Sequence, residues 1–408
     1  MTDKKKENQT SFDIFIANSI FPDAESLFAT YIKPLEAIKN TALVILDTNA
    51  LLVPYSIGKE SLTQIKETYK KLTKAEQLLV PGQVAREFAN NRTKKILELF
   101  QQLNRKQNNT HNLQKGKYPL LESLSDYQET IRIEKEIDNL LKDYRKAISN
   151  VLDHIRSWTW NDPVSLLYAE LFTKEVIFDL ALDQVKLQEE LYRRQLHKIP
   201  PGYKDSNKDD SGIGDLLIWF TILELGKSRK KDVIFVSSDQ KSDWWHSIEN
   251  QALYPRYELV DEFRRESNGF SLHIIPFSRF LDLYGASESV VEEVREEENR
   301  LNLEFGLIGE FVHKWQIIEQ VLISKYRALK PDSSLDRWLS PLQIADMLQQ
   351  KGLINRDLVI RIHELRKIRN VLVHEGSTNT LTNLEMKSMI ASMDEMIEIV
   401  DQPPNEPG

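Results

Sequence analysis

Four short apolar segments, each bounded by residues that break strands, constrain the fold of this chain most strongly. They lie at residues 42–46, 77–80, 232–238 and 271–277 and are rich in branched and aromatic side chains. A fifth candidate strand, YELV, occupies residues 257–260. Helical patterns lie between these segments. Apolar strands that alternate with helices are typical of a parallel sheet covered on both faces. The sequence therefore predicts an α/β fold built on a doubly wound parallel sheet.

Two regions of the chain depart from this alternation. Residues from about 96 to 195 are charged and helix-prone, which predicts a helical insertion with Trp158 and Trp160 as packing anchors. Residues 286–299 contain six glutamates and one arginine, a composition typical of a linker or of the start of an exposed helix. The strand pattern ends there, so we expect a second domain of a different class beyond this segment.

The C-terminal region has the pattern of a small all-helical bundle. Apolar side chains recur at steps of three and four residues, the spacing of an amphipathic helix; they are Phe305, Ile308, Val312, Trp315, Ile318 and Leu322. Three more helical stretches follow near residues 334–350, 355–375 and 382–399. The predicted organisation is an N-terminal extension at 1–40, an α/β domain at 41–285, an acidic linker at 286–299, a helical domain at 300–400 and a tail at 401–408.

Composition excludes several kinds of site. The 408 residues include no cysteine, which excludes disulfides, zinc–thiolate centres, iron–sulfur clusters and cysteine nucleophiles. We see no signal peptide and no apolar run near the ~18 residues that span a membrane, so we expect a cytoplasmic protein with no membrane partner. The formal net charge is −8, so a nucleic acid must meet local basic patches, as at 90–95 and 227–231. Such patches are equally typical of an ordinary solvated surface.

The first strand ends on a carboxylate, because the apolar run ALVIL leads directly into Asp47, Thr48 and Asn49. In an open parallel sheet, groups at the carboxyl ends of strands face the ligand crevice at the topological switch point. The simpler interpretation is that Asp47 or Thr48 caps the helix that follows. Taken alone, this pattern favours the cap.

Four further acids occupy comparable ends of elements. Asp239 follows the strand DVIFVSS, and Asp243 lies four residues beyond it. Glu87 lies near the start of a helix after another strand, and Asp215 lies in the first turn of a later helix. Each acid alone is explained as a cap or as a partner of the helix dipole. Two carboxylates ~4 Å apart repel by roughly 1–4 kcal/mol, so a cluster of them requires a cation. Hard oxygen ligands suit Mg²⁺ or Mn²⁺, ions that serve phosphoryl transfer.

These motifs resemble the PIN-domain nucleases. The resemblance rests on Asp47-Thr48-Asn49 after a strand, Glu87 in VAREF, Asp215 in GDLLIW and Asp239 in VSSDQKSDWW, and covers roughly 40–285. It is greatest to a large PIN-like subgroup with a helical insertion and a GYKD stretch, here at 202–205. The family implies a doubly wound sheet, one or two Mg²⁺ or Mn²⁺ ions, and hydrolysis of RNA or, in some members, DNA.

The resemblance also implies roles for individual residues. Asp47, Glu87, Asp215 and Asp239 match the family's metal ligands, Asp243 matches a frequent fifth acid, and Asn49 matches a polar residue that helps to hold the first carboxylate. Asp205, Asp209 and Asp210 are further loop acids whose roles vary within the family. We also consider that the basic residues Arg92, Lys94 and Lys95 steer phosphates.

A second motif closes the third helix of the C-terminal region, in the sequence ELRKIRNVLVHEGS. Asn370 and His374 share one helical face, which Arg366 extends, whereas Arg369 and His374 are five residues apart, about 140° of turn. An arginine and a histidine at a helix end are by default ordinary surface residues. The pattern of Arg369, a polar residue and His374 in a small helical bundle nevertheless resembles HEPN domains. That family implies dimerisation and, in some members, metal-free RNA cleavage by the arginine and the histidine.

The function predicted from these features is that of a metal-dependent endoribonuclease, and two RNase-like domains on one chain resemble bacterial toxins and phage-defence effectors. The expected partners are RNA, a second copy bound through the helical domain, and an inhibitory or activating protein. Two alternatives remain open: a non-catalytic nucleic-acid-binding or dimerising protein whose acids are only caps, and a nuclease that acts on DNA or through Arg369 and His374.

Overall fold

The structure is a computed structural model that describes residues 13–29, 31–109, 116–181, 183–205, 212–238, 241–248, 251–329, 339–375 and 381–401. The chain divides into two compact units, Met1–Glu298 and Asn299–Gly408. Among the described residues, no helix combines the length and apolarity required to cross a membrane.

The first unit is built on a five-stranded parallel sheet in the order β3-β2-β1-β4-β7. The strands are β1 (Leu43–Leu46), β2 (Leu78–Pro81), β3 (Ile177–Phe178), β4 (Val233–Val236) and β7 (Leu272–Ile275). The chain builds outward from β1 to β3 and then returns to the other side of β1 with β4 and β7. The predicted α/β class with a doubly wound sheet is therefore confirmed.

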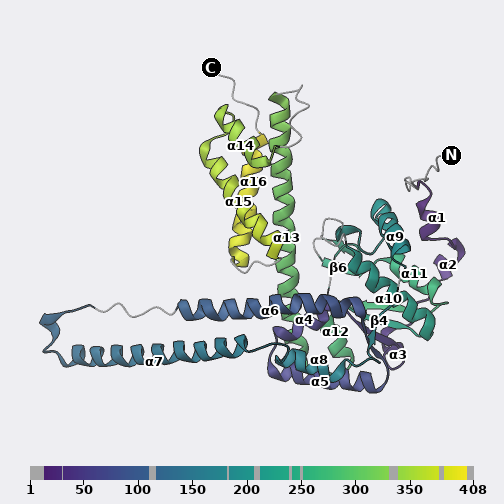
Figure 1. Ribbon diagram of the computed structural model, residues 1–408, viewed down its shortest axis with the longest axis horizontal. Helices are drawn as coiled ribbons and strands as arrows, with labels where there is room; N and C mark the ends of the chain where they lie inside the picture. The colour runs from purple at the N-terminus through teal and green to yellow at the C-terminus, as the bar shows by residue number, and fades with distance from the viewer. Residues whose placement is uncertain are drawn as a thin grey trace, which may run out of the picture. The chain divides into compact units, whose positions relative to one another are not determined.

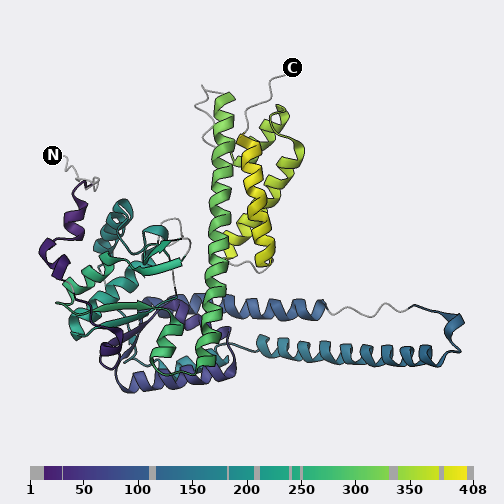
Figure 2. The same cartoon turned by 180° about the vertical axis from the view of Figure 1, so that it is seen from behind.

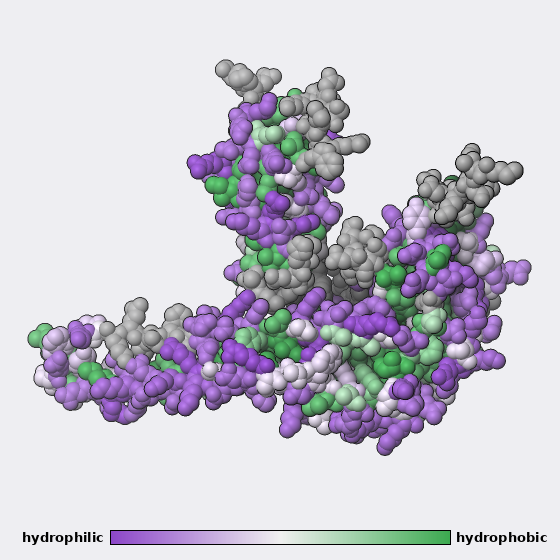
Figure 3. Space-filling model, viewed as in Figure 1, coloured by the Kyte–Doolittle hydropathy of each residue, from purple (hydrophilic) through white to green (hydrophobic). Residues whose placement is uncertain are grey.

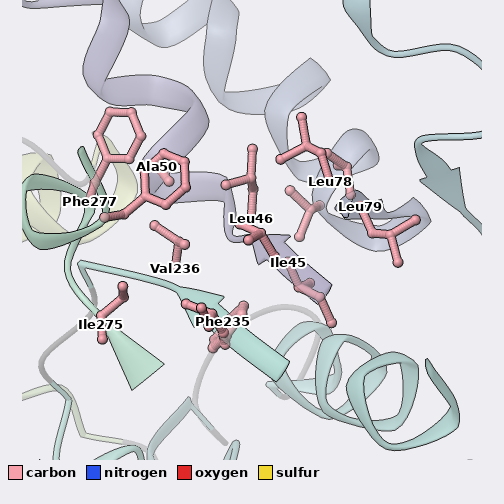
Figure 4. Packing of buried hydrophobic residues seen from close by; sticks show 14 of the residues in the cluster. Ile45, Leu46, Ala50, Leu78, Leu79, Phe235, Val236, Ile275 and Phe277 are labelled. Carbon is pink, nitrogen blue, oxygen red and sulfur yellow. The ribbon is translucent and has the colours of Figure 1, made fainter. Parts of the chain in front are cut away.

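Helices cover both faces of this sheet (Figure 1). On one face, Tyr69 of α5 (Lys59–Lys74) packs against Phe277 and Phe280 of α12 (Phe277–Leu283). On the other, α10 (Ile213–Arg229) packs against α11 (Tyr257–Glu266), and Trp219 of α10 meets Trp244 beside β4. Because β1, β2 and β4 are buried along their whole length, their apolar runs are continuous. Figure 4 shows Leu46, Leu78 and Val236 of these strands packed in one cluster with Ala50 and Phe277.

The predicted insertion forms a long helical arm and also part of the sheet domain. Helix α6 (Gly82–Asn108) starts directly after β2, and α7 (Ser125–Arg156) runs back beside it, as both Figure 1 and Figure 2 show. The visible face of this arm is predominantly hydrophilic in Figure 3. After the arm, α8 (Pro163–Leu171) and β3 return to the sheet, so the insertion is not wholly helical. Trp160 is 56% exposed, but one side of its ring packs against Phe88 and over the Arg92 guanidinium, so it contacts the sheet domain from the surface.

The first unit also contains further helices, 3₁₀ turns and a hairpin. They are α1 (Ile16–Ile20), α2 (Ala24–Ala29), α3 (Leu35–Ile38), α4 (Thr48–Leu52), α9 (Gln184–His197), the 3₁₀ turns η1 (Val53–Tyr55), η2 (Pro119–Leu121) and η3 (Tyr203–Asp205), and an antiparallel hairpin of β5 (Trp245–Ile248) and β6 (Gln251–Pro255). The predicted strand YELV is wrong, because these residues open α11, whose apolar side chains Leu259, Val260 and Phe263 are spaced for burial on one helical face.

The acidic segment 286–299 is not a free linker. Its residues from Glu288 begin helix α13 (Glu288–Leu329), and Val290, Val291 and Val294 are buried in the core of the first unit. Their spacing places the three valines on one face, which packs, while Glu292 and Glu296 are exposed and Glu298 is buried.

The second unit is helical, with the later turns of α13 followed by α14 (Pro341–Gln350), α15 (Arg356–Glu375) and α16 (Asn383–Asp401). Trp315, Ile318 and Leu322 are buried in its core, as the predicted apolar face required. Ile308 packs at the edge of that core, Val312 is partly buried, and the side chain of Phe305 lies outside the described residues. Ser340 and Gln343 form a reciprocal capping box at the start of α14.

Candidate active site

Asp47 lies at the topological switch point of the sheet. Leu46 is the register partner of Val236, so Asp47 and Ser237 leave the adjacent strands β1 and β4 side by side. Asp47 is only 8% exposed. Its Oδ2 accepts a 2.7 Å hydrogen bond from the Ser237 hydroxyl, and its Oδ1 accepts one of 2.7 Å from the Thr48 N–H. Asp47 is therefore the N-cap of α4 and, at the same time, a carboxylate at the position where such sheets bind ligands.

A short hydrogen-bond chain joins Asp47 to Glu87. The hydroxyl of Thr48 donates to Glu87 Oε2 at 2.6 Å, and the Gln83 side-chain amide donates to Glu87 Oε1 at 3.0 Å. Because α6 begins directly after β2, Glu87 stands in its second turn, beside α4. The fold thus brings together two of the predicted acids that are far apart in the sequence.

Two further predicted acids, Asp215 and Asp243, lie around Gly202. The Gly202 N–H donates to Asp243 Oδ2 at 2.9 Å, and Asp243 is fully buried. A Cβ atom at Gly202 would stand 3.8 Å from Asp215 Cβ and 3.0 Å from the Gly212 carbonyl oxygen. Gly202 has a φ of +91°, a backbone conformation that glycine adopts without strain, and it has no side chain to collide with these neighbours. The ammonium of Lys241 lies 3.9 Å from Asp215 Oδ2 and offsets part of the negative charge.

Other predicted acids cannot be placed. Asp239, Asp209 and Asp210 lie outside the described residues, as does the side chain of Asp205. Within the described part of the chain, no three acidic or histidine side chains form a group that could hold a metal ion. Asp239 follows Ser238 at the end of β4, the strand beside β1.

The chemistry of the donors fits a hard divalent cation. Asp47 and Glu87 offer only oxygens, and the hydrogen bonds described above reach those oxygens from neutral donors. A carboxylate oxygen has two lone pairs, so such a bond is compatible with metal ligation. Magnesium and manganese prefer oxygen ligands of this kind.

The predicted phosphate-steering role of Arg92 is wrong. Arg92 is 6% exposed, and its Nε donates to Asp162 Oδ2 at 3.0 Å and to the Ser165 hydroxyl at 2.7 Å. The ring of Trp160 lies 4.4 Å from its guanidinium carbon. Burial alone raises the pKa of Asp162, but hydrogen bonds from Ser165, Arg92 and Tyr55 outweigh it and hold that pKa below its ordinary value.

Two other basic residues of this predicted patch have different surroundings. Lys95 pairs with Glu98 at 3.1 Å, whereas Lys94 is exposed. The basic stretch at 90–95 is therefore not a single surface patch.

In the helical unit, the structure describes one residue of the predicted pair. Arg369 is partly buried in α15, where its Nη1 donates to Asn370 Oδ1 at 3.2 Å, and Arg366 is exposed. The backbone of His374 lies in the last turn of α15, but its side chain is outside the described residues. The meeting of Arg369 and His374 stays a prediction.

Gln83 and Ser237 are site residues that the sequence did not predict, and Thr48, considered there only as a possible cap, is a third. Thr48 and Ser237 donate hydrogen bonds to Asp47, while the role predicted for Asn49 stays a prediction. One sequence signal could have indicated Thr48 and Ser237 as site residues: in both DTN and SSD, polar residues directly follow a strand. The contact between Ser237 and Asp47 depends on the order of the strands in the sheet, which neither motif reveals.

The parallel sheet carries a buried acid at its switch point, and hydrogen bonds through Thr48 link this acid to a second one. A family model described as a PIN like domain matches residues 43–259, which is more than half of the chain. The chain therefore belongs to the PIN-like domain family. Members of this family are generally nucleases, which supports the prediction that this protein is a hydrolase. No curated protein and no solved structure matched the chain.

Proposed function

We propose that this protein is a metal-dependent endonuclease that hydrolyses phosphodiester bonds, with RNA as its substrate. The observation that carries the proposal is the buried Asp47 at the switch point, joined through Thr48 to Glu87, within a PIN-like domain. Capping of α4 explains the hydrogen bond from the Thr48 N–H to Asp47, but it does not explain why this carboxylate lies at the switch point next to a second acid. A role as a metal ligand would explain that position.

The proposed metal ligands are Asp47, Glu87, Asp215 and Asp239, with Asp243 as a fifth acid. A bound Mg²⁺ or Mn²⁺ would supply an activated water and stabilise the leaving oxygen. The chain's own residues orient this donor set. Ser237 and the Thr48 N–H hold the two oxygens of Asp47, and Gln83 and the Thr48 hydroxyl hold those of Glu87. Such fixed orientation is what a metal site requires from its surroundings.

The identity of the nucleic acid rests on the family resemblance. A carboxylate site does not use the 2′-hydroxyl, so the same residues serve RNA and DNA. The proposed biological role as a toxin or phage-defence effector rests on the same kind of analogy.

A second candidate function belongs to the helical unit. We propose that it is a HEPN-like domain that dimerises the protein or adds a second, metal-free RNase site. The described feature that favours it is the partly buried Arg369, whose Nε is a buried donor with no hydrogen-bond partner among the described residues.

The experiment that separates these proposals compares labelled single-stranded RNA and DNA of the same sequence. Each is incubated with Mg²⁺, Mn²⁺ or EDTA and with the wild type, Asp47→Asn or His374→Ala. RNA cleavage that is lost in EDTA and in Asp47→Asn supports the acidic site. Cleavage that persists in EDTA and is lost only in His374→Ala moves the chemistry to the helical unit, and preferential DNA cleavage contradicts the RNA assignment. An absence of cleavage in every lane argues for a non-catalytic binding protein.

A further inference from the structure

A pocket of about 630 Å³ lies among the end of α9, the turn η3 and the β5–β6 hairpin. Its wall carries three basic side chains, from Lys198, Lys204 and Arg256. It also carries three aromatic rings, from Tyr203, Trp245 and His246. Basic groups interleaved with aromatic rings are the surface that proteins use to bind single-stranded nucleic acid, because the cations meet phosphates and the rings meet bases.

The charge of the pocket is positive although the chain as a whole is acidic. No Asp or Glu of the described chain lines it. Behind the wall lies Glu258, with its oxygens 3.7 Å from Arg256 Nη1 and 4.0 Å from His246 Nε2. One such carboxylate against the three cations of the wall leaves an excess of positive charge. An anion of the phosphate type is therefore the natural occupant.

The arginine of this pocket is held in place and retains an unused donor. Arg256 Nη2 donates to the Tyr203 hydroxyl at 2.8 Å. The Nε of Arg256 and the Nε1 of Trp245 are buried donors with no hydrogen-bond partner among the described residues. A buried donor without a partner is costly, and an acceptor on a bound ligand would satisfy it once the side chain turns toward the pocket.

The pocket adjoins the acidic site through the chain itself. Tyr203 follows Gly202, whose N–H is bound by Asp243, and Ser242 directly precedes that aspartate. The Tyr203 hydroxyl lies 3.4 Å from the Ser242 carbonyl oxygen. Two residues that line the pocket, Tyr203 and Ser242, are thus covalent neighbours of Gly202 and Asp243.

We propose that this pocket binds one nucleotide of a single-stranded nucleic acid, next to the phosphodiester bond that the acidic site cleaves. Lys198 and Lys204 meet the phosphate, Arg256 and Trp245 donate to the ligand, and the rings contact the base. The position of the strand relative to the cut rests on the proposed nuclease function, whereas binding in the pocket does not.

The test measures binding of a labelled single-stranded RNA of about 12 nucleotides by fluorescence anisotropy, with full-length protein that carries Asp47→Asn to prevent cleavage. The pocket variant is Lys198→Gln/Lys204→Gln. The matched control is Lys227→Gln/Lys230→Gln, which removes the same charge from the other basic stretch. Lys198 and Lys230 are equivalent in their backbone, because both end a helix with a φ near +50° (53° and 52°).

We expect the pocket variant to bind on the order of tenfold more weakly at low salt. The slope of log Kd against log salt should fall by roughly 0.7 for each phosphate that the variant no longer neutralises. The control should retain the affinity and slope of the parent. Parent-like binding by the pocket variant, an equal loss of affinity in the control, or no RNA binding by the parent overturns the proposal. Far-ultraviolet circular dichroism of each variant confirms that the fold is intact.

Two further arms separate this proposal from the nuclease function and from a free nucleotide. Cleavage by the otherwise wild-type pocket variant at the parental rate, with parental affinity, overturns the pocket and leaves the nuclease intact. If RNA binding depends on the pocket but the wild type cleaves no RNA in Mg²⁺ or Mn²⁺, the proposed nuclease function is contradicted and the proposed binding pocket is retained. Competition by adenosine monophosphate at the same concentration as the RNA would show that the pocket takes a free nucleotide and overturns the proposed strand.

Discussion

The buried ion pair between Arg92 and Asp162 leads to a sharp test of how this fold is held together. Arg92 is 6% exposed and Asp162 is fully buried, and the two join α6 to the start of α8. The opposite oxygen of Asp162 accepts hydrogen bonds of 3.0 Å from the Tyr55 hydroxyl and 3.0 Å from the Ser165 N–H. Replacing Arg92 with Met leaves this carboxylate buried without its cation.

The magnitude follows from the burial of the two charges. Breaking a buried pair by removing one partner costs about 3–5 kcal/mol, because the remaining charge is uncompensated. The same helix supplies a control, since Arg86 pairs with Asp179 with side chains that are 60% and 56% exposed. An exposed pair contributes about 0–1 kcal/mol. We therefore expect Arg92→Met to destabilise the first unit several times more than Arg86→Met.

Differential scanning calorimetry of the full-length protein measures the difference, because the two units can unfold in separate transitions. For a domain of this size about 1 kcal/mol corresponds to roughly 2 °C, so Arg92→Met should lower the melting temperature of the first unit by roughly 6–10 °C. Arg86→Met should lower it by about 2 °C or less. Equal shifts in the two variants would refute the reasoning, because burial would then not govern the cost. A phosphate-binding role for Arg92 predicts the opposite pattern, with lost RNA affinity and unchanged stability.

Three further predictions concern stability. The folded-state pKa of Asp162 is lowered, so the stability that this carboxylate contributes is present above its unfolded-state pKa and is lost as the pH falls through the folded-state pKa. Asp162→Asn should therefore make the free energy of unfolding of the first unit depend less on pH in the acid range. Urea unfolding at pH 2–5 measures this dependence. Gly226→Ala should destabilise by about 1–3 kcal/mol in the same assay, because the new Cβ would lie 2.5 Å from Phe263 Cε2 and this overlap exceeds the gain in helix propensity of about 1 kcal/mol; a stabilised variant would contradict this. Glu298→Ala should cost about 1–3 kcal/mol by calorimetry, because its carboxylate accepts the Phe277 N–H at 2.7 Å, and Glu298→Gln should cost less; equal losses would argue against the role of the acceptor.

Local pattern was sufficient for the main strands. Continuous apolar runs identified β1, β2, β4 and β7, because strands buried on both faces require such runs. The two-residue strand β3 was missed because so short a segment has no periodicity. The segment YELV was misjudged because four apolar and polar residues fit a strand and a helix equally well.

In the candidate site too, the sequence predicted some features and missed others. The sequence alone identified Asp47, Glu87, Asp215 and Asp243 as acids at the ends of elements. It did not show that Thr48 bridges Asp47 to Glu87, or that Gly202 lies between Asp215 and Asp243. The Thr48–Glu87 and Gly202–Asp243 hydrogen bonds join segments that are distant in the sequence.

What the sequence by itself determined is therefore the class of the fold and the types of residue available for chemistry, since periodicity and residue type are local properties. Tertiary structure decided which of those residues meet and which are removed from solvent. Arg92 was expected to face a phosphate, yet it is buried against Asp162, 70 residues away. The basic pocket is likewise assembled from α9, η3 and the β5–β6 hairpin, and no one segment carries its pattern. Burial and convergence depend on how distant segments pack, and that information is absent from any single stretch of the chain.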